Sequence, residues 1–559
     1  MYGAAATLSH DGCARKPART QEPCMALPER PPSAPAASAY HRIIAGSTIA
    51  VMIGTLASMI LGFAREVVNA QYFGEHWELD AFLVAAIVPT LVFGVFNGSL
   101  VTALVPVFSG YFARNEPEEA WRLSSTVINA LVIVLSLCAL VGWFAAPLIV
   151  RVVAAGFPPN EVDVTAHMTR IMMPTIIATS IAGVLQALLN AQQRYRAASL
   201  QGLALNICAI AGVLVLFKTY GIFGLVFGTA IGSVAQLVVQ LPSYVRRCRY
   251  RFVLDLRHPG FTHLFAILGP IVIGSAVGQV NLLFDKYFAS TLEPGNIAAM
   301  QYATKVVGFP QQLFAAAIAT VIFPILSAHY ASNDERSLRG MASSGLRMTA
   351  LITIPAALGL IVLAQPIISV LFERGAFNYG DLTRTAGAMQ FYAVGLLGLA
   401  ANMVLTRCFF ATRDSRTPVL VASFVMVENV ACSALLVHPF GINGLATANS
   451  LSSLTEAAVL IALLQRRIGA VEGGIFGASV WRITVAAAAM GLAAYLTNAI
   501  LWHDEGAIWQ HTATLAVDLL AGGAVFFGVG TLLRVRELAT LLAMAAEYVG
   551  RRAARAARA

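Results

Sequence analysis

Charged residues are scarce in this chain of 559 residues. Asp, Glu, Lys and Arg make up 12% of it, whereas hydrophobic residues make up 58%. Soluble domains carry about 25% charged and about 45–50% apolar residues, so polar groups cannot cover the surface of a chain this apolar. The composition argues against a water-soluble enzyme or a nucleic-acid-binding protein, and it indicates a protein that lies in a membrane.

Motifs for nucleotide, metal and disulfide chemistry are also missing. The sequence contains no glycine-rich run ending in Gly-Lys-Ser/Thr, and its ten histidines and seven cysteines show no ligand spacing and no Cys-x-x-Cys pair. We therefore expect no catalytic site and no bound cofactor. Energy for any transport would come from an ion gradient, the membrane potential or the substrate gradient.

The N-terminal residues 1–41 are rich in Pro, Ala, Ser and Arg and lack the apolar core of a cleaved signal peptide. We expect this segment to be a disordered cytoplasmic tail, because it cannot bury enough surface to offset the cost of ordering. Met1 and Met25 both stay open as the start of the protein.

Long apolar runs fill the rest of the chain. One membrane-spanning helix needs about 20 apolar residues, and the sequence predicts an all-α polytopic membrane protein with fourteen such spans. Several contain proline, which membrane helices tolerate where neighbouring helices or a wet cavity satisfy the freed backbone. The predicted spans are 43–64, 80–108, 123–150, 164–190, 199–217, 222–244, 264–290, 297–328, 346–372, 383–410, 418–437, 442–464, 482–502 and 512–533.

The connections between these spans alternate in charge. One set is arginine-rich, as at Arg246, Arg247 and Arg249, and the intervening set is acidic, as at Asp504 and Glu505. By the positive-inside rule the arginine-rich set is cytoplasmic. Both termini are then cytoplasmic, which requires an even number of spans and agrees with the count of fourteen.

Similar segments recur about 219 residues apart. Residues 106–116 match 324–334, residues 146–156 match 365–375, and residues 220–225 match 440–445. Each copy holds six spans, so the copies are parallel and their pseudo-two-fold axis runs along the membrane normal. The predicted organisation is an N-lobe (42–245), a basic cytoplasmic loop (246–263), a C-lobe (264–465), two further spans (466–535) and a basic tail (536–559). Two lobes around a central cavity suit alternating access.

Ionisable side chains within the spans are few, and such groups usually face a cavity or a partner. Arg65, Arg170 and Lys305 would make a cationic cavity for an anion such as pyrophosphate. A structural ion pair stays open for each charged group. Three acids of the C-lobe are candidates for binding a coupling cation or proton: Asp285, which precedes Lys286, Glu428 and Glu456.

Short segments resemble the MurJ/MviN family over residues 43 to 535. The more specific ones are residues 80–82, Asp-Ala-Phe, and residues 372–377, Phe-Glu-Arg-Gly-Ala-Phe. Residues 61–66, 156–157, 302–303, 309–310, 409–414 and 417–418 add to the resemblance. That family belongs to the multidrug/oligosaccharidyl-lipid/polysaccharide exporter superfamily, and its members are fourteen-helix flippases that move lipid II, the undecaprenyl-pyrophosphate precursor of peptidoglycan, across the inner membrane.

The resemblance implies a central cavity whose arginines hold the pyrophosphate, and a groove at the last two spans for the polyprenyl tail. Arg65 matches a cavity arginine, Asp80 matches the aspartate of the Asp-Ala-Phe segment, and Lys305 stands where the family has an arginine, which keeps the charge and loses the bidentate fork. Two other places where the family carries arginine hold uncharged residues: Met59, and Phe93 with Gly94.

The expected function is therefore that of a lipid II flippase, a transporter and not an enzyme, in the inner membrane. Its expected partners are the lipid-linked saccharide and membrane lipids, with no nucleic acid, and we expect a monomer. Two alternatives stay open: a flippase for another polyprenyl-linked saccharide, and a cation-coupled multidrug exporter on the same fold. The paired cations Arg65 and Lys305 argue against the exporter.

The charge pattern makes the topology testable. A reporter fused after Asp504 should appear in the periplasm, and one fused near Arg249 should appear in the cytoplasm, because arginine-rich connections are retained on the cytoplasmic side. Activity of an alkaline phosphatase fusion and of a green fluorescent protein fusion at each site measures this. The opposite location at either site would contradict the predicted orientation.

Overall fold

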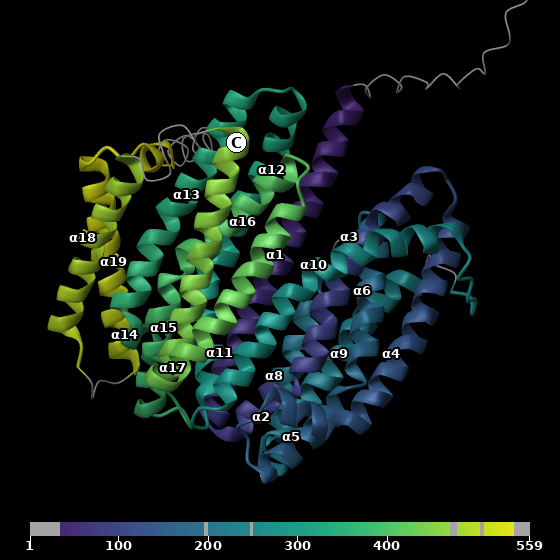
Figure 1. Cartoon of the computed structure of the whole chain (residues 1–559), viewed down its shortest axis with the longest axis horizontal. Coiled ribbons are helices and arrows are strands. Elements are labelled where there is room, and N and C mark those ends of the chain that lie inside the picture. The colour runs from purple at the N-terminus through teal and green to yellow at the C-terminus, as the bar shows by residue number, and fades with distance from the viewer. Residues whose placement is uncertain (1–33, 195–198, 246–249, 470–477, 504–507, 542–559) are drawn as a thin grey trace, which may run out of the picture. The chain divides into compact units, whose positions relative to one another are not determined.

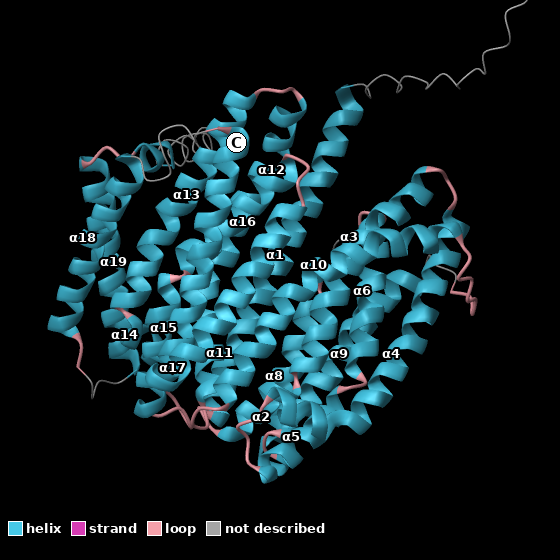
Figure 2. Ribbon diagram, viewed as in Figure 1, coloured by secondary structure: helices cyan, strands magenta, loops and turns pink. Residues whose placement is uncertain are grey.

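The computed structural model describes residues 34–194, 199–245, 250–469, 478–503 and 508–541. Within these ranges the protein is helical and contains no strand (Figure 2). The predicted all-α class is confirmed. Residues 1–49 and 50–559 form two compact units, and the packing described below is that of the second unit.

The helices follow one another with short connections (Figure 1). In chain order they are α1 (Ala34–Phe73), α2 (Trp77–Ala85), α3 (Ile87–Ala113), α4 (Pro117–Val153), α5 (Pro159–Met172), α6 (Thr175–Ala191), α8 (Gln201–Tyr220), α9 (Phe223–Val245), α10 (Pro259–Ser290), α11 (Asn296–Pro310), the π-helix η1 (Gln311–Ala315), α12 (Ala316–Ala331), α13 (Glu335–Val362), α14 (Ala364–Phe372), α15 (Tyr379–Val394), α16 (Leu396–Ala411), α17 (Arg416–Ile468), α18 (Ala478–Leu501) and α19 (Ile508–Leu532).

Each predicted span falls on one of these helices or on a broken pair of them. By length and apolar composition, nine of the described helices qualify as membrane spans, or ten if the bent pair α15 and α16 is one span. The chain is therefore a multi-pass membrane protein, and the number fourteen stays a prediction. Spans eleven and twelve run together as α17, which is interrupted at Gly441, whose φ of 57° favours glycine.

Two prolines lie at breaks between consecutive helices. Pro174 separates α5 from α6, and Pro310 ends α11 just before the π-helical turn η1. Proline cannot donate the backbone hydrogen bond of a helix interior, so bends collect at such positions. Pro270 lies inside α10, and the helix continues through it.

The start of α1 differs from the prediction. Residues 34–41 were placed in the N-terminal tail, but the helix begins at Ala34. The reason lies in the local composition: the segment is alanine-rich, and Pro35 occupies the first turn, where its missing N–H costs nothing. The remainder of the predicted tail, residues 1–33, lies outside the described residues, as do residues 246–249 and 542–559.

Among the described residues, the apolar cluster that joins the two lobes lies at one end of the helices. One large cluster contains side chains of both lobes near the end of α1 and the start of α2, among them Phe73, Phe82, Tyr302 and Phe372. At the opposite ends of the helices the lobes have separate clusters. One lies among α3, α4, α6 and the start of α10, and the other among α12, α13, α16 and α17. The lobes are thus packed together at the end that the charge pattern assigns to the periplasm.

Helix α10 belongs to both lobes. Its first half packs in the N-lobe cluster through Phe261, Leu264 and Leu268, and its second half bonds to α17 through Asp285 and Asn449. The last two helices, α18 and α19, pack on each other and on α13. Because it crosses between the lobes, α10 brings C-lobe side chains to a cavity lined mainly by the N-lobe.

Candidate binding cavity

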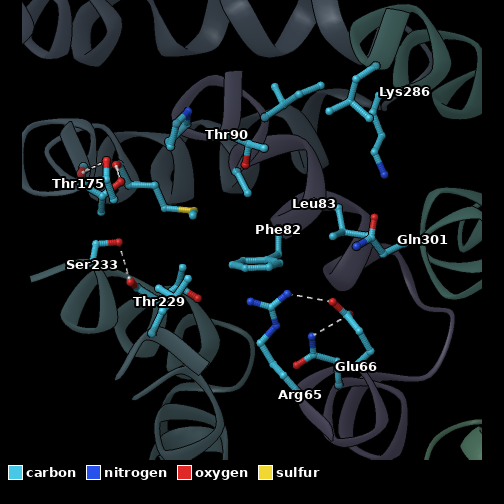
Figure 3. A pocket seen from close by; sticks show the side chains of 18 of the residues that line it. Arg65, Glu66, Phe82, Leu83, Thr90, Thr175, Thr229, Ser233, Lys286 and Gln301 are labelled. Carbon is cyan, nitrogen blue, oxygen red and sulfur yellow. Dashed lines mark hydrogen bonds and ion pairs between the residues drawn. The ribbon is translucent and has the colours of Figure 1, made fainter. Parts of the chain in front are cut away.

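A cavity of about 290 Å³ lies between the N-lobe and helices α10 and α11. Helices α1, α2, α3, α5, α6, α8 and α9 contribute the N-lobe wall, and α10 and α11 contribute the opposite one. Figure 3 shows Thr229 and Ser233 on one side, Lys286 and Gln301 on the other, and the ring of Phe82 near the centre. The cavity therefore has charged and polar groups set among apolar walls.

Three cations line this cavity, and one acid accompanies them. Arg65 comes from α1, Lys286 from α10 and Lys305 from α11, and the acid is Glu66. The Arg65 Nη2 atom lies 2.8 Å from Glu66 Oε1, and Asn69 donates to the other Glu66 oxygen at 3.5 Å. The charges leave an excess of two positive charges, which suits an anion with two negative charges.

Arg65 and Lys305 were predicted to face one cavity from the two lobes, and the structure brings them together there. Arg65 is held in place by its ion pair with Glu66, whereas the side chain of Lys305 is exposed. A guanidinium that keeps one donor edge on a carboxylate still has further N–H groups to offer. Their role in binding substrate stays a prediction.

Lys286 and Glu66 were not predicted as part of the site. Lys286 was considered only as a neutralising neighbour of Asp285. Residues i and i+1 of a helix do not face each other, so this spacing signals that Lys286 points away from Asp285. Glu66 could have been found from its position next to Arg65, two residues after the end of the predicted span 43–64.

Asp80 and Arg170 do not line this cavity in the structure. Asp80 is buried, at 2% exposure, and its two oxygens accept hydrogen bonds from the backbone N–H groups of Gly295 at 2.6 Å and Ala298 at 2.7 Å. Arg170 donates to the carbonyl oxygen of Trp143 on α4 at 3.3 Å. Their predicted role in substrate binding stays a prediction, and the structure gives both a structural contact.

The three candidate coupling acids each have a separate partner. Asp285 accepts from Asn449 at 3.1 Å, Glu428 from Thr455 at 2.9 Å and Glu456 from Asn402 at 2.8 Å. In the described part of the chain no group of three or more His, Cys, Asp or Glu side chains is arranged to hold a metal ion.

The lobes meet at a seam next to the cavity. The Asp80 carboxylate caps the N-terminus of α11, where the first N–H groups of a helix lack partners and the helix dipole favours a negative charge. Gln71 accepts from the backbone N–H of Ala376 at 2.8 Å, and Gly74 accepts from the hydroxyl of Tyr302 at 3.2 Å. These contacts connect α1 and α2 to α11 and to the loop after α14.

Glu75, in the loop between α1 and α2, adds a buried acid to the seam. Thr385 of α15 donates to its Oε1, and Arg384 lies 3.3 Å from its Oε2. Burial raises the pKa of Glu75 well above its usual range, and the Thr385 hydrogen bond and the Arg384 charge only oppose this in part. A proton on Glu75 therefore favours the closed seam, and the seam weakens as pH rises and Glu75 ionises.

Comparison with known proteins identifies the family. The model of the family described as "Lipid II flippase MurJ" matches residues 69–516, which is more than half of the chain. The chain belongs to the MurJ family. A family member of Vibrio cholerae named probable lipid II flippase MurJ is 28% identical over 506 residues, covering 88% of this chain and 95% of the relative. A lipid II flippase MurJ of Burkholderia cenocepacia is 26% identical, and the match covers 94% of that relative.

Solved structures agree with this assignment. A lipid II flippase MurJ in an inward closed conformation has a TM-score of 0.74 and 25% identity, covering 87% of this chain and 98% of that one. An inward-facing multidrug transporter of the MATE family in the MOP superfamily has a TM-score of 0.64 at 15% identity, with 76% of this chain covered. The second likeness concerns the fold alone.

The cap at the seam predicts a loss of stability in Asp80→Ala. Two buried N–H groups of α11 lose their acceptors, so the free energy of unfolding should fall by about 2–3 kcal/mol. Asp80→Asn retains one side-chain oxygen, so its free energy of unfolding should lie between that of Asp80→Ala and that of the unchanged chain. The melting temperature of the purified protein in detergent measures the effect.

The matched control is Asp163→Ala, which removes an exposed acid from α5 and should leave the melting temperature unchanged. Unchanged melting of Asp80→Ala together with lost lipid binding would contradict the capping role, and it would support the substrate-binding role predicted from the sequence.

Proposed function

We propose that this chain is a flippase that moves lipid II across the inner membrane by alternating access. The observation that carries the proposal is the cavity between the lobes, with Arg65, Lys286 and Lys305 on its walls and an excess of two positive charges. The curated relatives that the chain matches over most of their length are named lipid II flippase MurJ. The chain is on this basis a transporter and not an enzyme.

The physical task is to carry a charged head group through hydrocarbon about 30 Å thick. A charge in that layer is costly unless it has partners, and the cavity supplies them. Cations compensate the diphosphate, and Thr229, Ser233 and Gln236 offer hydrogen bonds to hydroxyl groups. The polyprenyl tail needs no such shelter and stays among the lipids, next to the two added helices α18 and α19.

The cavity volume corresponds to one conformation of an alternating-access transport cycle. Pockets for drug-sized ligands measure about 300–1,000 Å³, and this one, at about 290 Å³, lies at the lower end of that range. A larger head group requires the lobes to separate further at the end where their apolar clusters are already separate. Release on the other side requires the seam at Asp80 and Glu75 to open.

A flippase for another polyprenyl-linked saccharide is the second candidate, since the diphosphate would be held in the same way. The family resemblance favours arginines at the positions of Met59, Phe93 and Gly94, and their absence here is what this second candidate would explain. A multidrug exporter for cations fits poorly, because a cavity with excess positive charge repels a cationic substrate.

We further propose an inner-membrane location with both termini in the cytoplasm. The support comes from the arginine-rich connections and from the separate ends of the lobes, which would then face the cytoplasm where lipid II is made. The coupling cation or proton is proposed to bind at Asp285, with Glu428 and Glu456 as the other candidates.

Arg65→Ala tests the function. One charge-assisted contact contributes about 1.5–3 kcal/mol, so lipid II transport should fall about tenfold or more, while Arg65→Lys should lose less. The measurement is growth and lipid II accumulation when each variant replaces the resident flippase in a depleted bacterial strain. Arg151→Ala, which removes an exposed arginine at the end of α4, is the control.

Growth of the depleted strain on the unchanged chain, with no accumulation of lipid II, supports the function. Failure of the well-expressed unchanged chain to relieve the accumulation would contradict lipid II as its substrate. Equal growth with Arg65→Ala would contradict the role of the cavity arginine.

Asp285→Asn tests the coupling site. The amide keeps the hydrogen bond with Asn449 and removes the charge, so transport should lose its dependence on the ion gradient or on pH while the protein stays folded. Transport into vesicles with an imposed sodium or proton gradient measures this. Asp163→Asn is the control, and unchanged gradient dependence in Asp285→Asn would rule the residue out.

A further inference from the structure

Lys286 lies deep in the cavity wall and has an unpaired ammonium group. The residue is 4% exposed, and its side chain lines the cavity from α10. Among the described residues, no acceptor lies within hydrogen-bond distance of its Nζ atom. An ammonium group offers three donors and accepts none, so Lys286 has three donors without a partner beside the cavity that its side chain lines.

The three acidic side chains that could pair with Lys286 already have other partners. Asp80 accepts from two backbone N–H groups, Asp285 accepts from Asn449, and Glu66 pairs with Arg65. None of these acids forms a hydrogen bond with Lys286 in the described structure.

Such a group is costly unless a partner reaches it. A buried ammonium without hydrogen bonds loses its hydration and gains little in return. The cost is removed when an anion with free oxygens enters the cavity. Lys286 is thus poised for a ligand, unlike Arg65, whose charge is already paired with Glu66.

We propose that Lys286 is a direct contact of the diphosphate of the lipid substrate, and that it makes the cavity prefer a diphosphate over a single phosphodiester. This inference rests on the proposed function, because it names which atoms of the same head group are held. Arg65 and Lys286 reach the cavity from different sides (Figure 3), so they suit two phosphates that are joined but separate.

The charges agree with this preference. A diphosphate that links a polyprenyl chain to a sugar carries two negative charges, and the three cations with Glu66 leave two positive ones. A single phosphodiester carries one negative charge and two free oxygens. Arg65 and Lys305 satisfy these, so Lys286 would stay unpaired when such a lipid binds.

The test is a binding measurement on the full chain in lipid nanodiscs. Lys286→Met keeps the length of the side chain and removes its charge, and Lys286→Arg keeps the charge. Lys218→Met, which removes an exposed lysine of α8, is the control. The probes are lipid II, undecaprenyl diphosphate, and undecaprenyl-phosphoryl-glucose, which contains one phosphodiester.

Lys286→Met should bind both diphosphates about tenfold to a hundredfold more weakly than the unchanged chain, the loss that corresponds to one charge-assisted hydrogen bond. Its affinity for the phosphodiester should change less than threefold. Lys286→Arg should stay within about threefold for all probes, and Lys218→Met should be unchanged. If Lys286→Met does not give a monodisperse protein, Lys286→Gln is measured in its place.

Equal affinity of Lys286→Met and the unchanged chain for lipid II would overturn the inference, and so would an equal loss for all three probes. An unchanged chain that prefers undecaprenyl diphosphate to the phosphodiester, and loses this preference in Lys286→Met, supports the inference even if it fails to move lipid II in cells. Failure to move lipid II in cells would contradict the proposed function alone, so failure of the function and failure of the inference are distinguishable.

Discussion

The cost of placing a charge in hydrocarbon governs this structure. Every ionisable group that enters the bilayer needs a partner there, and the chain has few such groups. Glu66 is paired with Arg65 and Asp80 with the start of α11. Asp285, Glu428 and Glu456 are hydrogen-bonded to neutral side chains. The charges of the cavity are the ones with donors to spare, and that surplus marks the place where a substrate enters.

The internal repeat explains how the lobes meet. Gly156 of the N-lobe lies against the backbone of Ser290, and Gly375 of the C-lobe lies against the backbone of Gln71. Gly375 follows Gly156 by 219 positions, and Ser290 follows Gln71 by 219 positions. The two contacts are thus copies of one another, and an added Cβ at either glycine would lie about 2 Å from a backbone oxygen. Only glycine lets the backbones approach this closely.

Much of the fold was predictable from the sequence, because the membrane imposes long apolar helices and charged connections. The repeat and the convergence of Arg65 with Lys305 also followed from the pattern of residues along the chain. The partners of Asp80 could not be predicted, since Gly295 and Ala298 lie 215 and 218 positions away and contribute backbone groups that leave no trace in the sequence. The early start of α1 at Ala34, inside the predicted tail, was missed because alanine is common both in helices and in linkers.

Lys286 shows why the candidate site was only partly predictable. Its neighbour Asp285 in the sequence suggested an ion pair, yet consecutive helix residues point in directions about 100° apart. Asp285 turns to α17 and Lys286 turns to the cavity. The two side chains reach different lobes because α10 crosses between the lobes. One face of the helix packs on the C-lobe, and the adjacent face contributes a cation to the cavity beside the N-lobe. A movement of α10 relative to the N-lobe would therefore change the distance between Lys286 and Arg65. Binding of a diphosphate and separation of the lobes are therefore linked through α10.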